Sequence, residues 1–159
     1  LIQRDIDLMA PMAAKGLLRV GVSITTLDPK LCRSLEPRAA APHRRLQTVK
    51  ALSEAGIPVT VMMAPIIPAI NDMEIETLLE AAAANGAISA GYVLLRLPYE
   101  IKDLFHEWLA QHVPDRAAKV INLLRDMRGG KDYDARWFVR GRGRIGRGSW
   151  RGRVEAPGD

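Results

Sequence analysis

Apolar and polar residues alternate over a short stretch near the start of the chain, and this pattern sets the expected fold. In residues 20–25 (VGVSIT), valine and isoleucine alternate with glycine, serine and threonine. A two-residue period is typical of a strand whose two faces have different surroundings. A strand buried on both faces would be apolar throughout. We therefore predict that the small, polar face of this strand lines a ligand cavity.

A helix and a second strand follow and complete a β–α–β unit. Pro42 suits a first helical turn, apolar residues recur at helical spacing up to Leu52, and Gly56 marks the helix end. The following residues, IPVTVMMA, form a nearly continuous apolar run, as expected for a buried parallel strand. Ligands of parallel sheets bind at the carboxyl ends of strands. We therefore expect residues 23–38 and 65–72 to surround one site.

The rest of the chain continues the alternation of helices and strands. Asn71 and Glu74 have the spacing of a capping box, so helix capping is the expected role of Asn71. Residues 101–109 place Ile, Leu, Phe, Trp and Leu on one helical face. The expected elements are helices over residues 3–15, 42–56, 72–86, 101–109 and 114–127, and strands over residues 20–25, 57–64 and 89–97. This order predicts an α/β fold with about three parallel strands and right-handed crossover helices, too few strands to close a barrel.

Composition narrows the class of protein. The 159 residues are one domain's worth of chain, and 48% of them are hydrophobic, which is enough for a core. No apolar run approaches the length that crosses a bilayer, and the first residues do not resemble a signal peptide. We therefore expect a cytoplasmic protein with no membrane partner. The single cysteine, Cys32, excludes an internal disulfide and a multi-cysteine metal site, so no metal ligand is assigned to this chain.

Charge is unevenly placed along the chain. Residues 1–135 hold 16 basic and 16 acidic residues, whereas residues 136–159 hold seven arginines against Glu155 and Asp159, which accounts for the net charge of +5. We predict a domain over residues 1–135 and a disordered, low-complexity Gly/Arg-rich tail over residues 136–159. The tail is either an arm for weak, nonspecific nucleic-acid binding through phosphate contacts or the product of a frameshift. Residues 1–135 carry no net charge, so their charge gives no reason to expect nucleic-acid binding by this part of the chain.

Five polar residues near the predicted strand ends are candidates for ligand contacts. Ser23 and Thr25 end the first strand on its polar face, where they bind either a ligand or the backbone of the following turn. Glu36 and Arg38 flank a proline. Either Arg38 binds a ligand carboxylate with Glu36 orienting it, or both belong to a solvated loop. Arg96 ends the third strand, where a charge needs a ligand, a partner or water. No catalytic residue is assigned.

Three strings carry a resemblance to a known family. S-x-T-T-L-D over residues 23–28, L-E-P-R over residues 35–38 and P-I-I-P-x-I-N-D over residues 65–72 occur in this order. Together they resemble the middle and later strands of radical S-adenosylmethionine (SAM) enzymes. The branch that the chain resembles is the DNA repair photolyase-like one, related to spore photoproduct lyase. The resemblance covers residues 1–135 and implies the later half of a (β/α)6 partial TIM-type barrel.

The resemblance also implies cofactors. SAM and a [4Fe–4S] cluster are expected in the complete enzyme, which would form a 5′-deoxyadenosyl radical and abstract hydrogen from an unknown substrate, with a nucleic-acid lesion as one candidate. The resemblance places near the cofactor Ser23, Thr25, Glu36, Arg38 and Arg96.

The chain lacks the family's C-x-x-x-C-x-x-C loop. We therefore expect an amino-terminally truncated piece that binds no cluster and is inactive alone. Two alternatives remain: a piece of another parallel α/β barrel enzyme, and a non-catalytic nucleic-acid-binding module that acts through the Arg-rich tail.

Overall fold

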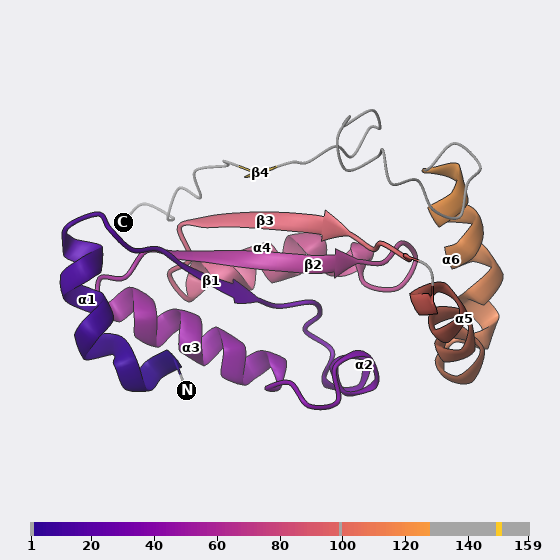
Figure 1. The fold of residues 1–159 in the computed structure, drawn as a ribbon, viewed down its shortest axis with the longest axis horizontal. Helices are drawn as coiled ribbons and strands as arrows, with labels where there is room; N and C mark the ends of the chain where they lie inside the picture. Colours follow the sequence, from indigo (N-terminus) through magenta and orange to yellow (C-terminus); the bar gives the residue numbers. More distant parts are fainter. Residues whose placement is uncertain (1, 99, 128–148, 151–159) are drawn as a thin grey trace.

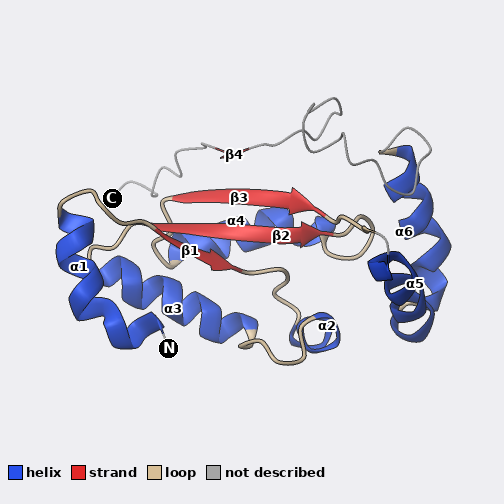
Figure 2. Cartoon of the chain, viewed as in Figure 1, coloured by secondary structure: helices blue, strands red, loops and turns tan. Residues whose placement is uncertain are grey.

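The computed structural model describes residues 2–98, 100–127 and 149–150. Helices and strands alternate through most of the chain (Figures 1 and 2). The helices are η1 (Ile2–Asp5, 3-10), α1 (Ile6–Ala14), α2 (Pro29–Leu35), α3 (Pro42–Glu54), η2 (Asp72–Glu74, 3-10), α4 (Ile75–Ala84), α5 (Glu100–His112) and α6 (Pro114–Asp126). The strands are β1 (Val20–Ser23), β2 (Val59–Ile66), β3 (Ser89–Leu94) and β4 (Ser149–Trp150).

The predicted three-stranded parallel arrangement is confirmed. The sheet has the order β1-β2-β3-β4, and the pairs β1–β2 and β2–β3 are both parallel. The first three strands point the same way in Figure 1, so their carboxyl ends lie at one edge, toward α2, α5 and α6. The two-residue strand β4 pairs antiparallel with Ala90 and Gly91 of β3. The result is an open α/β sheet, consistent with part of a TIM-like barrel.

The helices that connect the strands cover one face of the sheet. Along β2, Val59, Val61 and Met63 are buried, whereas the alternate residues Thr60 and Met62 are partly exposed. Helix α3 contacts β1 and β2, and it also contacts α4. In a doubly wound sheet, helices lie on both faces, whereas the crossover helices of a barrel share one side. The one-sided packing therefore favours the barrel-like arrangement.

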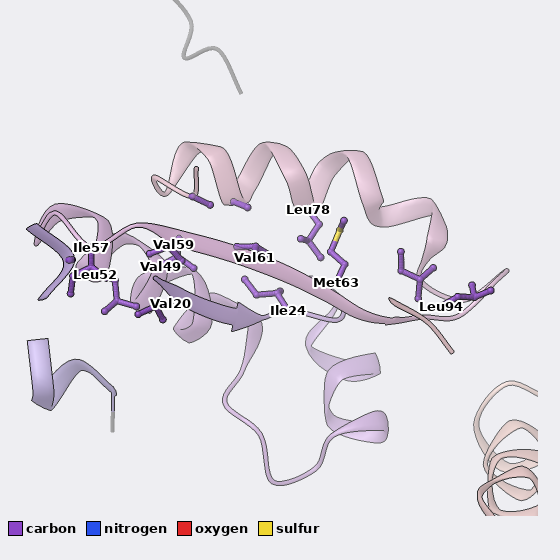
Figure 3. Packing of buried hydrophobic residues seen from close by; sticks show 14 residues of the cluster. Val20, Ile24, Val49, Leu52, Ile57, Val59, Val61, Met63, Leu78 and Leu94 are labelled. Atoms are coloured by element: carbon purple, nitrogen blue, oxygen red, sulfur yellow. The ribbon is translucent and has the colours of Figure 1, made fainter. Parts of the chain in front are cut away.

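The main core lies between this face of the sheet and the helices. Val49 and Leu52 of α3 and Leu78 of α4 are almost completely buried, and Figure 3 shows Leu78 directed from α4 toward Met63 and the sheet. Val49 and Leu52 have the helical spacing that predicted the helix over residues 42–56. A second buried cluster joins α5 and α6 to the loop after β2, and it consists of Ile67, Ile70, Leu97, Phe105, Leu109, Val120 and Leu124.

Three sequence expectations need correction. Residues 29–35, predicted as part of a loop, form helix α2, because Asp28 accepts a hydrogen bond from the Lys30 amide at 2.7 Å and a proline occupies the first turn. Strand β3 ends at Leu94 and not at residue 97. Ile101 and Leu104, predicted on the inner face of α5, are 49% and 63% exposed, since this helix packs through its Phe105 and Leu109 side.

Two further expectations concern the tail and the membrane. The predicted tail, residues 136–159, lies outside the described residues except for Ser149–Trp150, so its predicted disorder is not tested. Within the described residues, every helix is too short or too polar to span a bilayer.

Glycine is required at position 86 for two reasons, its positive φ and its close approach to Ser53, and replacing it should therefore lower stability. Its φ is +88°, and a Cβ there would lie 2.6 Å from Ser53 Cβ on α3. Gly56 ends α3 with a similar φ of +73° but has nothing within 4 Å. We expect Gly56→Ala to lower the free energy of unfolding by about 1–2 kcal/mol and Gly86→Ala by about 2–4 kcal/mol. Urea unfolding measures both, and equal losses would contradict the role of the Ser53 contact.

Candidate cofactor-binding site

The carboxyl ends of β1 and β2 lie side by side and are joined by one buried side chain. Asn71 is 3% exposed. Its Nδ2 donates to Thr25 O at 2.8 Å and to Pro65 O at 3.0 Å, while its Oδ1 accepts from Ile67 N at 2.6 Å. The loops after both strands are therefore fixed relative to each other by a single amide group, which uses both its donor and its acceptor capacity.

The predicted capping box of Asn71 and Glu74 is wrong. The Asn71 side chain makes no cap hydrogen bond to the following 3-10 helix, η2. The Glu74 carboxylate instead accepts from Thr26 Oγ1 at 2.6 Å and from Leu27 N at 2.8 Å. Both side chains bond groups in the loop after β1, which is distant in the sequence. The groups of that loop that they bond lie beyond the end of β1 and have no strand partners among the described residues, so they are available for these bonds. The sequence spacing matched a local motif, but long-range bonds to the neighbouring loop replaced it.

A second network surrounds the end of β1. Thr25 Oγ1 donates to Glu36 Oε2 at 3.0 Å, and Arg45 Nη2 donates to the same oxygen at 2.8 Å. Arg45 also donates to Ser23 O at 2.7 Å and to Ala40 O at 2.9 Å. The side chains of Arg45 and Glu36 are 12% and 31% exposed. The network therefore ties the strand end to the start of α3 and to the loop that joins α2 and α3.

The polar face of β1 is exposed at Gly21 and Ser23, and the prediction that it lines a ligand cavity stays a prediction. Among the described residues, the Ser23 hydroxyl makes only a long hydrogen bond of 3.4 Å to Ala64 O. Thr25, by contrast, is 5% exposed, and its hydroxyl is bound to Glu36. Ser23 is thus accessible to a ligand, whereas Thr25 is buried and its hydroxyl is used to hold Glu36.

The two predicted arginines lie outside this network. Arg38 is exposed in the loop after α2, and it makes no hydrogen bond or ion pair with any residue that the structure describes. The expectation that Glu36 orients Arg38 is therefore wrong, because Glu36 pairs with Arg45. Arg96 is exposed and lies two residues beyond the end of β3. The structure brings together Ser23, Thr25 and Glu36 but adds neither arginine to their network.

Comparison with known proteins assigns the family. The sequence model of the radical SAM superfamily matches residues 2–82, slightly more than half of the chain. The chain belongs to the radical SAM superfamily. The matched region runs from η1 into α4 and contains the whole network around Glu36. Membership implies SAM and a [4Fe–4S] cluster as the cofactors of the superfamily's chemistry.

Several curated proteins resemble this radical SAM chain. The uncharacterized protein Rv2578c of Mycobacterium tuberculosis is 32% identical over 127 residues, which are 79% of this chain and 37% of that protein. The uncharacterized protein MJ0683 of Methanocaldococcus jannaschii is 31% identical over 74 residues, 46% of this chain and 27% of that protein. The chain thus spans little more than a third of the mycobacterial relative's length. No solved structure matches it.

The residues of this radical SAM chain do not fit an iron–sulfur cluster. The cluster needs three cysteine thiolates in this superfamily, and the chain has one cysteine. Cys32 is buried in α2, with Sγ 4.0 Å from Ala40 O. Among the described residues, no group of three or more His, Cys, Asp or Glu side chains lies together as a metal site would require.

Sequence reasoning missed Arg45, although a signal was present. Arg45 precedes Val49 by four residues and Leu52 by seven, so it lies on the buried face of α3. A charged residue in phase with core positions must find partners, because an unpaired buried charge is costly. That signal predicts a bound guanidinium, although it does not identify Glu36 as the partner.

A substitution at Asn71 tests the connection between the two strand ends. Asn71→Asp keeps the shape and the acceptor but removes both donors, so the carbonyls of Thr25 and Pro65 would face a carboxylate oxygen. We expect the free energy of unfolding to fall by about 2–4 kcal/mol. Asp72 is the exposed neighbour of Asn71 and provides a control. Asp72→Asn should change the free energy of unfolding by less than about 0.5 kcal/mol. A loss at Asn71 as small as that at Asp72 would contradict the connection.

Proposed function

We propose that this chain is the later half of a radical SAM core and binds SAM at the carboxyl ends of β1 and β2. The observation that carries the proposal is the polar network at the end of β1, which joins Thr25, Glu36, Arg45 and the Ser23 carbonyl and leaves the Ser23 side chain exposed. In the complete enzyme, SAM and the cluster would supply radical chemistry for hydrogen abstraction from the substrate. The chain's own residues hold and orient SAM.

The available donors and acceptors suit a nucleoside linked to an amino acid. The Ser23 side chain is exposed, and its hydroxyl makes one long bond, to Ala64 O, within the described part of the chain. It can therefore accept from a ligand, and it can donate to one by giving up that long bond. Glu36 Oε1 receives no hydrogen bond from any described residue, and a carboxylate oxygen accepts from ribose hydroxyls or an ammonium group. Thr25 holds Glu36 through the hydrogen bond from its hydroxyl to Oε2. Arg38, exposed and unpaired among the described residues, is the group that we assign to the carboxylate of SAM.

Arg96 is the fifth residue that we assign to the site. It follows β3, whose carboxyl end lies at the same edge of the sheet as those of β1 and β2. Its position supports a contact with SAM or with the substrate. The cluster ligands, which the chain lacks, would come from a part of the protein outside these 159 residues.

We further propose the DNA repair photolyase-like branch, related to spore photoproduct lyase, as the chain's place within the superfamily. The supporting feature is the order of the strings S-x-T-T-L-D, L-E-P-R and P-I-I-P-x-I-N-D. The structure places residues of all three strings around the joined ends of β1 and β2, through Thr25, Glu36 and Asn71. Membership of this branch would make a nucleic-acid lesion a candidate substrate. Nucleic-acid binding by the Arg-rich tail remains a separate proposal, and that tail lies almost entirely outside the described residues.

Ligand binding tests the proposal directly. S-adenosylhomocysteine, which lacks the methyl group of SAM and with it the sulfonium charge but keeps the nucleoside and the amino-acid part, should bind the unaltered chain in calorimetric titration. Ser23→Ala and Arg38→Gln should each weaken binding by about tenfold, the equivalent of one good hydrogen bond to a charged or polar ligand group.

The matched controls are Ser34→Ala and Arg33→Gln on α2, which should change the dissociation constant by less than about twofold. No measurable binding by the unaltered chain, or equal effects of site and control variants, would reject the SAM site.

Metal analysis tests the proposed source of the cluster. After anaerobic reconstitution with iron and sulfide, we expect this chain to retain far less than one cluster, because a single buried thiolate cannot replace three. Iron and sulfide determination, with the visible absorption spectrum, provides the measurement. A stoichiometry near one cluster per chain would show that these 159 residues supply the ligands themselves.

A further inference from the structure

Arg45 connects more segments around the candidate site than its neighbours on α3 do. Its three guanidinium nitrogens donate to the Ser23 carbonyl of β1, the Ala40 carbonyl of the α2–α3 loop and the Glu36 carboxylate. All three distances are 2.9 Å or less, and the side chain is 12% exposed. A guanidinium is planar and carries its donors in a fixed fork, so these three bonds set the position of each acceptor relative to the others.

The two oxygens of Glu36 are used differently. Oε2 accepts from both Arg45 Nη2 and Thr25 Oγ1, whereas Oε1 has no hydrogen-bond partner among the described residues. Two donors on one oxygen fix the rotation of the carboxylate about its terminal bond. Oε1 is then held in one orientation as an acceptor, on a side chain that is 31% exposed.

We propose that Arg45 is a positioning residue for the ligand site: it holds Glu36 so that Oε1 accepts a hydrogen bond from the bound nucleoside ligand. This inference rests on the proposed function, since it names what orients one of the proposed contacts. Arg45 does not touch the ligand. It acts through Glu36 and through the Ser23 carbonyl, which fixes the end of the strand that carries the Ser23 hydroxyl.

The group that donates to Oε1 is a hydrogen-bond donor of the ligand, either a ribose hydroxyl or the ammonium of the amino-acid part. Two probes separate these sources. S-adenosylhomocysteine carries both donors, whereas 5′-methylthioadenosine keeps the ribose and lacks the amino-acid part. Loss of affinity for both probes in an Arg45 variant assigns the donor to the ribose, and loss for S-adenosylhomocysteine alone assigns it to the ammonium.

The central experiment compares Arg45→Lys with Arg44→Lys. Arg44 precedes Arg45 on α3 but is exposed, and its side chain bonds only to Gln47 Oε1, at 3.3 Å, among the described residues. A lysine keeps the charge but cannot reproduce the three-way fork. We expect Arg45→Lys to weaken S-adenosylhomocysteine binding by about tenfold or more, and Arg44→Lys by less than about twofold.

Glu36→Gln provides a second readout that leaves Arg45 unchanged. Because Arg45 and Thr25 both present donors, the amide must place its carbonyl oxygen where Oε2 lies and its NH2 group where Oε1 lies. A donor would then face the ligand's donor, and affinity should fall by about tenfold or more. If the glutamine side chain that replaces Glu36 could rotate freely, it would turn its amide oxygen to the ligand, and ligand affinity would fall little. If Arg45→Lys does not fold, this variant decides the question.

The double variant Arg45→Lys/Glu36→Gln separates positioning from a general structural role. If Arg45 acts through Glu36, its effect on binding should largely disappear when Glu36 is already glutamine. If Arg45 only supports the fold, the fold-losses in affinity of the two single variants should multiply in the double variant. Multiplying effects, or equal binding by the Arg45 and Arg44 variants, would overturn the inference. In that case the unaltered chain would still bind S-adenosylhomocysteine and Ser23→Ala would still weaken it, so the proposed function would survive.

Discussion

Parallel pairing of β1, β2 and β3 is the constraint on which the rest of this structure depends. Parallel strands require crossover connections, and here α3 and α4 both lie on one face of the sheet. That face therefore carries the core residues, including Val59, Val61 and Met63. The opposite face carries small and polar residues such as Gly21 and Ser23, which the helices leave exposed. Parallel pairing also brings all three carboxyl ends to one edge, so a ligand site built there draws on several loops at once.

The carboxyl edge creates a second requirement, because backbone groups beyond the strand ends lose their ladder partners. Asn71 bonds the carbonyls of Thr25 and Pro65, and Arg45 bonds the carbonyl of Ser23. Glu74 similarly accepts from the Leu27 amide. Each of these side chains is far along the sequence from at least one group that it satisfies. The polar residues at this edge thus have a structural task before any ligand binds, and their presence alone is not evidence of a site.

The sequence predicted the regular part of the fold well, because that part depends on local periodicity. The alternation in residues 20–25 and the apolar run in residues 57–64 identified β1 and β2, and helical spacing identified the buried face of α3. Helix α2 was missed although its Asp28 cap and following proline are visible in the sequence. The partner of Glu36 could not be predicted, because the choice between Arg38 and Arg45 depends on how the loop folds back onto α3.

The distinction between a structural and a ligand-binding role depends on which polar atoms remain available after folding. Asn71 uses both of its amide N–H donors and accepts one hydrogen bond on its oxygen within the protein, and the residue is 3% exposed, so donation to a ligand would require breaking bonds that hold the strand ends together. Glu36 differs, since one oxygen accepts from two donors and the other accepts from none of the described residues. A purely structural ion pair does not require this asymmetry, because both carboxylate oxygens can face a guanidinium fork. The asymmetry at Glu36, which Arg45 links to the Ser23 carbonyl, is therefore the feature that most directly favours a ligand over a merely stabilised loop.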